Sequence, residues 1–150
     1  MSTRMLALNE SIAIRDCFKL TLVEYQFPDA KDKYDSNWLI VTLAARDEIS
    51  TVEMTGPYLL TFELENWLQE ISGLLAGSHR ELSLEPIEPT LKLHIAKKDE
   101  LGHFDLRLVI RSELKRSTAA GSVHAYTCEI DQTDLQILER ELARTLKAFP

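Results

Sequence analysis

The sequence has little cysteine, glycine or positive charge, and each shortage excludes a class of protein. Two cysteines in 150 residues are too few for a disulfide framework or a four-cysteine zinc site. Five scattered glycines never take the spacing of a phosphate-binding loop. Lysine and arginine total 17 against 24 acidic residues, which gives a net charge of -7. A general nucleic-acid-binding protein carries a basic excess, so we expect no nucleic-acid partner.

Long apolar segments are also missing. The longest apolar stretch, Leu39 to Ala45, is interrupted by Thr42 and is far shorter than the roughly 20 residues of a membrane-spanning helix. The first ten residues hold too few apolar positions for a signal peptide. These absences predict a cytoplasmic protein without a membrane partner. Cys17 and Cys128 are expected to be free thiols buried in strands, and a redox pair is the alternative.

The composition that remains is that of an ordinary folded protein. Hydrophobic residues make up 45% of the chain and charged residues 27%, which are usual values for globular domains. No internal repeat, low-complexity tract or flexible linker divides the sequence. A chain of this length can bury one sizeable core but hardly two. We therefore expect residues 1–150 to form a single domain.

The first half of the chain reads mainly as β-strands. Apolar and polar residues alternate over 18–22, which is the period-two pattern of a half-buried strand. Trp38 to Ala45 is apolar on both faces, which predicts a central strand covered on both sides. Ile49 to Met54 is expected to be its hairpin partner. Gly56-Pro57 is predicted to end these strands.

A helix is predicted next, over about residues 61–76. Thr61 is placed as its N-cap, and Glu63 and Glu65 fall in the first turn, where negative charge suits the helix dipole. Apolar residues then recur at three- and four-residue steps and form one stripe. Gly77 is expected to cap the C-terminal end.

The second half repeats this plan. Apolar and polar residues alternate over 91–96 and again over 104–110. With the turn at 99–102 between them, these segments form the clearest hairpin. A polar loop around 117–121 leads to a strand over 122–130, and a helix follows over about 133–147. Two runs of strands, each followed by one helix, predict an α+β fold. Its mostly antiparallel sheet is expected to have about seven or eight strands, with the helices packed on one or two sheet faces.

Reactive side chains form no recognisable catalytic or metal-binding pattern. No serine lies in a strand-to-helix elbow, and the four histidines lack the spacing of a zinc hydrolase. The aspartates of the 29–35 loop lack the glycine and the spacing of a calcium loop. A site built from His94 and His103 across their hairpin is the alternative to surface histidines. We expect no catalytic residue, no metal site and no cofactor.

Two acidic stretches are the best candidates for contact with a partner. On the predicted helix, Phe62 lies among polar residues on the face opposite the apolar stripe, and an exposed aromatic side chain suggests an interaction surface. The loop over 28–36 carries three aspartates. The predicted partner-binding residues are Phe62, Glu63, Glu65, Asn66, Glu70, Asp29, Asp32 and Asp35.

Several short motifs occur in a characteristic order. Tyr34-Asp-Ser-Asn-Trp-Leu39 opens an apolar strand, and Gly56-Pro-Tyr-Leu-Leu-Thr61 leads into a helix that contains Glu63-Leu64 and Trp67-Leu68. Pro86-Ile-Glu-Pro89 then precedes a Leu-x-Leu-x-Ile hairpin. Over about residues 10–130, the chain resembles the WapI-type immunity protein family of small bacterial domains.

The resemblance implies an antitoxin. Such a protein binds the toxic domain of a contact-dependent secreted toxin, often a nuclease, and blocks it stoichiometrically in the cytoplasm. It implies no catalytic residue, because the family has none. The motif residues expected to serve the fold are Asp35, Asn37, Trp38, Gly56 and Leu64.

The charge balance fits this implied role, because an acidic inhibitor is steered towards the basic cleft of a nuclease. The alternative function is an interaction or scaffold domain, including a homodimer that buries Phe62 or Ile137.

Overall fold

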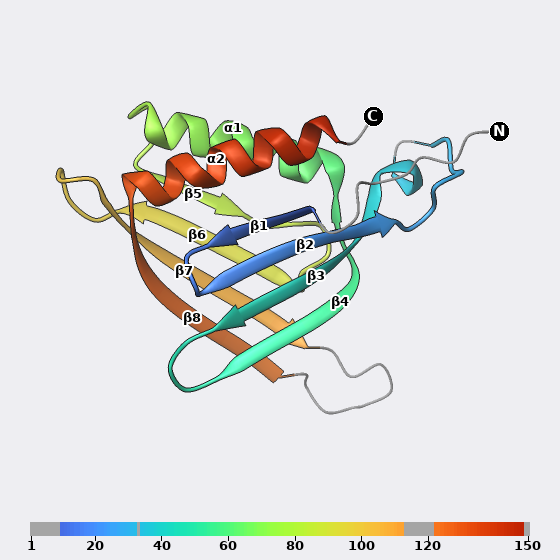
Figure 1. The fold of residues 1–150 in the computed structure, drawn as a ribbon, viewed down its shortest axis with the longest axis horizontal. Coiled ribbons are helices and arrows are strands. Elements are labelled where there is room, and N and C mark those ends of the chain that lie inside the picture. Colours follow the sequence, from blue (N-terminus) through green and yellow to red (C-terminus); the bar gives the residue numbers. More distant parts are fainter. Residues whose placement is uncertain (1–9, 33, 113–121, 149–150) are drawn as a thin grey trace.

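The computed structural model describes residues 10–32, 34–112 and 122–148. Within these residues, eight strands form two four-stranded antiparallel sheets, and each run of strands is followed by one helix (Figure 1). This confirms the predicted α+β fold and its two runs. The strands are divided between two sheets, and the polar loop expected around 117–121 lies outside the described residues.

Each half of the chain supplies one sheet in simple up-and-down order. The first half contains β1 (Glu10–Ile14), β2 (Phe18–Tyr25), the short 3-10 helix η1 (Asp35–Asn37), β3 (Trp38–Arg46), β4 (Thr51–Leu60) and α1 (Thr61–Leu75). The second half contains β5 (Glu81–Leu84), β6 (Leu91–Lys97), β7 (His103–Ser112), β8 (Ser122–Asp131) and α2 (Gln132–Lys147).

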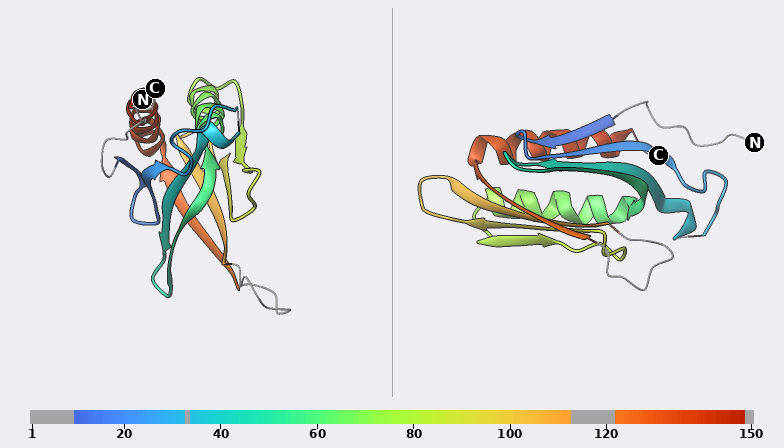
Figure 2. Two further views of the ribbon diagram at one scale, coloured as in Figure 1. Left: turned by 90° about the vertical axis from the view of Figure 1, so that its right-hand side faces the viewer. Right: turned by 90° about the horizontal axis from the view of Figure 1, so that it is seen from below.

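The two sheets face one another, and the two helices lie side by side along one side of the pair (Figure 2). Buried residues of both sheets and both helices form one continuous apolar cluster. Along β3, Leu39, Val41 and Leu43 point into this core, whereas Trp38 and Ile40 on the other face are only half-buried. The prediction that this strand is covered on both sides is therefore wrong, because among the described residues only one face of its sheet packs against the core.

The helices lie over sheet edges. The sequence had suggested that they would pack on sheet faces. Helix α1 packs against β5, the edge strand of the second sheet, and α2 packs against β1, the edge strand of the first. Each helix thus covers the exposed edge of the sheet made by the other half. The backbone N–H of Ala13 on β1 donates to Glu141 Oε2 on α2 at 3.0 Å, and the Ser72 hydroxyl on α1 donates to Glu139 Oε2 on α2 at 2.6 Å.

Strand β4 continues through Gly56-Pro57, where the sequence predicted a stop. The register shifts between Leu39 and Val41, so that Val41 lies opposite Gly56 and Leu39 lies opposite Leu59. Between these two pairs β4 has one residue more than β3, and this extra residue is absorbed at the irregularity. Because β4 is an edge strand, a proline there costs no hydrogen bond that a neighbouring strand needs.

The ends of α1 show how its first turn is held. The helix begins at Thr61, so the N-cap position is Leu60, whose side chain has no acceptor. The Glu63 carboxylate instead accepts from the Leu60 N–H at 2.9 Å, which corrects the assignment of Thr61 as the cap. At the other end, Gly77 has a φ of +81° and, with Ser78, closes the turn by hydrogen bonds to the last carbonyls. The predicted role of Gly77 is confirmed.

Candidate protein-binding site

The structure brings the two predicted acidic stretches together. The segment between β2 and β3 lies against the start of α1, where the rings of Tyr34 and Phe62 meet edge to face with centroids 5.9 Å apart. The Thr61 hydroxyl donates to Asn37 Oδ1 at 2.7 Å. The loop and the helix therefore form one continuous surface. We call it the loop–helix surface and define it by Asp29, Asp32, Tyr34, Asp35, Phe62, Glu65, Asn66 and Glu70.

Asp32 organises the loop part of this surface. Its Oδ1 accepts hydrogen bonds from the backbone N–H groups of Asp35, at 2.8 Å, and Tyr34, at 3.1 Å. The hydrogen bond from the Asp35 backbone is the main cause that lowers the pKa of Asp32. The neighbouring Asp32 charge in turn raises the pKa of Asp35. Asp29, Asp32 and Asp35 are all exposed, as is Lys31 between them, so the described part of this turn keeps a net negative charge.

Glu63 is placed differently from the other predicted contact residues. Its side chain is turned inward and is 8% exposed. One carboxylate oxygen accepts from the Leu60 N–H, and the other accepts from the Ile87 N–H at 2.8 Å. Glu63 therefore joins the start of α1 to the connection between β5 and β6. Its contacts are those of a structural residue.

The helix part of the surface borders a cleft of about 310 Å³ between α1 and β5. Glu63 and Trp67 line it from the core side, and Asn66, Gln69 and Glu70 line it from the exposed side of α1, opposite Ser83 and Glu85. Glu65 and Glu85 make no ion pair with any described residue. Glu85 was interpreted from the sequence as part of a solvated connector around Pro86, because the short strand β5 that ends just before it was not predicted, although Leu82 and Leu84 alternate with exposed residues there.

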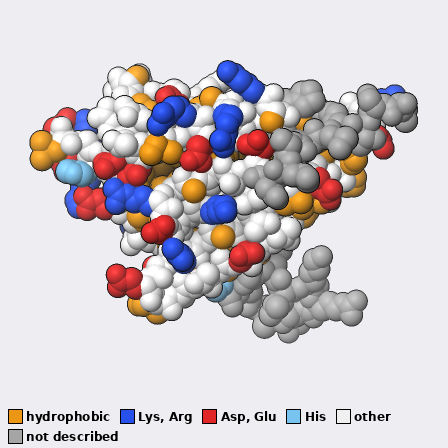
Figure 3. Space-filling view, in the orientation of Figure 1, with side chains coloured by type: hydrophobic (Ala, Val, Ile, Leu, Met, Phe, Trp, Pro, Cys, Tyr) orange, Lys and Arg blue, Asp and Glu red, His pale blue; other side chains and the backbone are white. Residues whose placement is uncertain are grey.

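Acids and cations are paired on the face formed by α2 and the first sheet. Figure 3 shows the two kinds of charge interspersed over this face. Arg15 Nε lies 2.7 Å from Asp134 Oδ2, and Arg144 lies 3.7 Å from Glu10. Because the charges of this face are paired, it carries little net charge, in contrast to the loop–helix surface.

The histidines of the central hairpin lie apart. His94 is paired across strands with Arg107 and has Glu81 as its side-chain neighbour at 3.3 Å. His103 Nδ1 lies 2.8 Å from Asp99 Oδ2 at the far end of the hairpin. The register therefore removes the alternative of a shared site between His94 and His103. In the described ranges, no three histidine, cysteine or acidic side chains are grouped as metal ligands.

Comparisons with known proteins give one family. The model of the Immunity protein WapI-like family matches residues 11–150. No curated protein matches the chain. Among solved structures, the chain is similar to one described as "Crystal structures of trypanosoma bruciei MRP1/MRP2", with 11% sequence identity, a TM-score of 0.47, and coverage of 93% of this chain and 84% of that chain. A similarity this low carries no functional argument.

The structure adds that no helix in its described part is long and apolar enough to cross a membrane. The family match spans both sheets and both helices, and its first residue lies within β1. On this evidence, the chain belongs to the WapI-like immunity protein family.

Proposed function

We propose that this protein binds the toxic domain of a cognate bacterial toxin in the cytoplasm and blocks it stoichiometrically. The observation that carries the proposal is the family match over residues 11–150, which includes nearly the whole chain. The predicted single-domain organisation of residues 1–150 is part of the proposal. It is supported by the buried cluster to which both halves contribute.

The loop–helix surface is the proposed contact area. Tyr34 has 51% of its surface exposed and stands on the half-buried ring of Phe62. Binding surfaces between proteins commonly place an aromatic anchor inside a polar rim. Here Glu65, Asn66 and Glu70 supply that rim.

The partner that fits this surface is a basic one. Negative charge at the rim accelerates association with a positively charged domain and weakens with added salt. A nuclease has such a surface, because its substrate is a polyanion. We therefore propose a nuclease as the toxin, blocked by covering of its basic cleft, with no chemical step on the side of the immunity protein.

The homodimer alternative has less support from the geometry. The Phe62 ring already packs against Tyr34 of the same chain. Ile137 is 37% exposed and shares a shallow depression with Arg140, Glu141 and Arg144. One apolar side chain among charges is a small nucleus for a stable interface.

The test first searches the genes next to this one for a toxin domain and then uses the domain found there. Growth protection and the dissociation constant of the purified pair are measured at low and at moderate salt. The double variant Glu65→Lys/Glu70→Lys should weaken binding by about 10-fold or more, since each lost rim attraction is turned into a repulsion. Tyr34→Ala should weaken it by about 30-fold if Tyr34 is the anchor.

The matched control is Glu24→Lys/Glu53→Lys, which makes the same charge change at two exposed positions of the first sheet. This control should bind within a few fold of the unchanged protein. Equal effects of the two double variants would place the contact area elsewhere. Absence of both binding and protection would overturn the antitoxin function, and a concentration-dependent dimer in that case would favour the scaffold alternative.

A further inference from the structure

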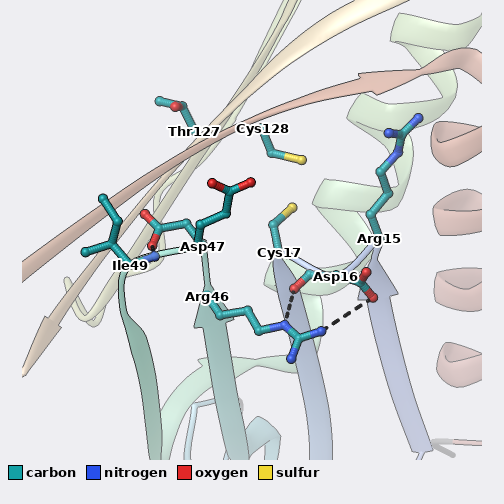
Figure 4. Close-up of a pocket in the computed structure, with 9 residues that line it drawn as sticks. Arg15, Asp16, Cys17, Arg46, Asp47, Ile49, Thr127 and Cys128 are labelled. Atoms are coloured by element: carbon teal, nitrogen blue, oxygen red, sulfur yellow. Dashed lines mark hydrogen bonds and ion pairs between the residues drawn. The ribbon is translucent and has the colours of Figure 1, made fainter.

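A second cleft, of about 670 Å³, lies where the first sheet approaches β8. Its walls are the β1–β2 turn at Arg15–Cys17, the start of the β3–β4 turn at Arg46–Ile49, and Thr127 and Cys128 of β8. Figure 4 shows the sulfur atoms of Cys17 and Cys128 directed towards each other across this cleft. The two cysteines of the chain, one from each half, thus meet at a single place.

Backbone hydrogen bonds fix both cysteines in position. Cys17 lies in the turn, not in a strand as the sequence suggested, because Arg15 takes a positive φ of 47° that reverses the chain. Its N–H donates to the Ile14 carbonyl at 3.2 Å, and its carbonyl accepts from the Arg46 N–H at 3.0 Å. Cys128 is paired with Leu106 in the middle of β7 and β8.

Strand alternation explains why Cys128 faces the other sheet. Tyr126 and Ile130, two positions before and after it, are both buried in the core between the sheets. Successive side chains of a strand point to opposite faces, so Cys128 shares their inward direction. It is half-buried, as is Cys17, because both lie at the open end of the core.

The two thiols also interact. Burial is the main cause that raises the pKa of Cys17 to about 12, and the nearby Cys128 side chain is the next. The Cys17 thiol donates to the Ile14 carbonyl at 3.2 Å and the Cys128 thiol to the Glu129 carbonyl at 3.6 Å. Side-chain rotations that release these hydrogen bonds would bring the two sulfur atoms to the bond length of about 2.05 Å found in disulfides. The half-buried state of both thiols leaves them within reach of a small reagent in the cleft.

We propose that Cys17 and Cys128 form a reversible disulfide that joins the two sheets, with a soluble low-molecular-weight disulfide as the oxidant. In the first exchange, one cysteine thiolate attacks the soluble disulfide, forms a mixed disulfide and releases one small thiolate, which takes up the proton. In the second, the other cysteine attacks the protein sulfur and releases the second small thiol. Two electrons pass from the protein thiols to the soluble disulfide, which leaves as two thiols.

The order of the two exchanges follows from the surroundings of the sulfurs. Because Cys17 holds its proton more strongly than an ordinary thiol, it is the poorer first nucleophile. The mixed disulfide is therefore expected at Cys128. That modification removes the free thiol of Cys128 and its charge, which contribute to the raised pKa of Cys17, and so favours attack by Cys17.

The disulfide lies far from the proposed contact area. Strand β2 begins at the turn that holds Cys17 and ends at the loop that leads to Tyr34, so the two sites are at opposite ends of that strand. Closing the disulfide should leave binding at the loop–helix surface unchanged. A chain that does not form the disulfide can therefore still bind the toxin, and a chain that does not bind the toxin can still form the disulfide.

The experiment incubates the full chain with oxidised glutathione and follows intact mass and free thiols. The expected product is lighter by two hydrogens, has no free thiol, and gives one linked peptide containing Cys17 and Cys128. Its melting temperature should rise by about 10 °C, because the link restricts the unfolded chain. Dithiothreitol should reverse both changes.

The variants Cys17→Ser and Cys128→Ser are the matched controls. Each should stop at one stable glutathione adduct, and the adduct should form faster in Cys17→Ser, which keeps the expected first nucleophile. A doubly glutathionylated chain, a product linked between two chains, or two thiols still free after prolonged incubation with excess oxidant would each overturn the inference.

Discussion

Glu63 offers the sharpest test of how the start of α1 is built. It is an acidic residue on a helix that the sequence suggested for partner contact, yet its carboxylate is buried and accepts two backbone hydrogen bonds. Glu63→Ala removes both acceptors at once. The Leu60 and Ile87 N–H groups then lose their partners, and the first turn of α1 loses the side-chain acceptor that caps the Leu60 N–H.

The expected cost follows from the two contacts. A hydrogen bond to a charged group contributes about 1.5–3 kcal/mol, and a buried donor left unpaired costs a similar amount. The Leu60 N–H is buried, whereas the Ile87 N–H is only partly buried and can be reached by water. We therefore expect Glu63→Ala to lower the free energy of unfolding by about 3–4 kcal/mol, or the melting temperature by about 10 °C.

Urea unfolding measures this cost as a shift of the midpoint at constant slope. Glu63→Gln keeps one carbonyl oxygen as an acceptor and should lower the free energy of unfolding by about half as much as Glu63→Ala. Glu65→Ala, two positions along the same turn and exposed, should change stability by less than about 1 kcal/mol. A loss below about 1 kcal/mol for Glu63→Ala would refute the structural role, and a folded variant with greatly reduced toxin affinity would restore Glu63 as a contact residue.

Three further predictions concern other parts of the fold. Gly77→Ala should lower the free energy of unfolding by about 1 kcal/mol, since a Cβ at φ +81° is strained although space around it is open; Gly77→Asn should cost less, and urea midpoints compare the two. The Thr145 hydroxyl is buried without a hydrogen-bond partner among the described residues, so Thr145→Val should raise the melting temperature by a few degrees in calorimetry; a decrease would contradict this. The backbone N–H of Asp134 lowers the pKa of Asp131 below its ordinary 3.8, so this stabilisation is present above that pH and is lost as pH falls through the folded pKa. Asp131→Asn should therefore flatten the dependence of stability on pH below about pH 4, and an unchanged acid dependence would refute the assignment.

The sequence predicts those elements whose signals are local. Helix α1 ends within one residue of the predicted boundary and α2 begins within one, because apolar residues recur on one stripe and Gly77 favours the left-handed turn. The central hairpin of β6 and β7 follows from strict alternation. Strand β5 has only four residues, too few for periodicity to distinguish it from a connection.

Tertiary context decides the elements that were predicted wrongly. The continuation of β4 past Pro57 depends on its place at a sheet edge, which the strand itself does not encode. Glu63 satisfies half of a capping box, but Leu60 is no capping residue, so the pattern pointed to Thr61 instead. The contact of Tyr34 with Phe62 and the approach of Cys17 to Cys128 join residues from separate elements, and no local spacing reveals them.

Each helix covers the edge strand of the sheet that is made by the other half of the chain. The order in which the chain is synthesised therefore matters for its folding. Strand β1 is made early, but the helix that covers it, α2, follows every strand of the described chain. Until α2 leaves the ribosome, the edge of the first sheet and the inner face of that sheet have no complete cover. A nascent chain stalled before Gln132 therefore exposes an edge strand open to pairing with other chains. Chaperones that shield such edges should bind the nascent chain up to that length and release it once α2 has docked.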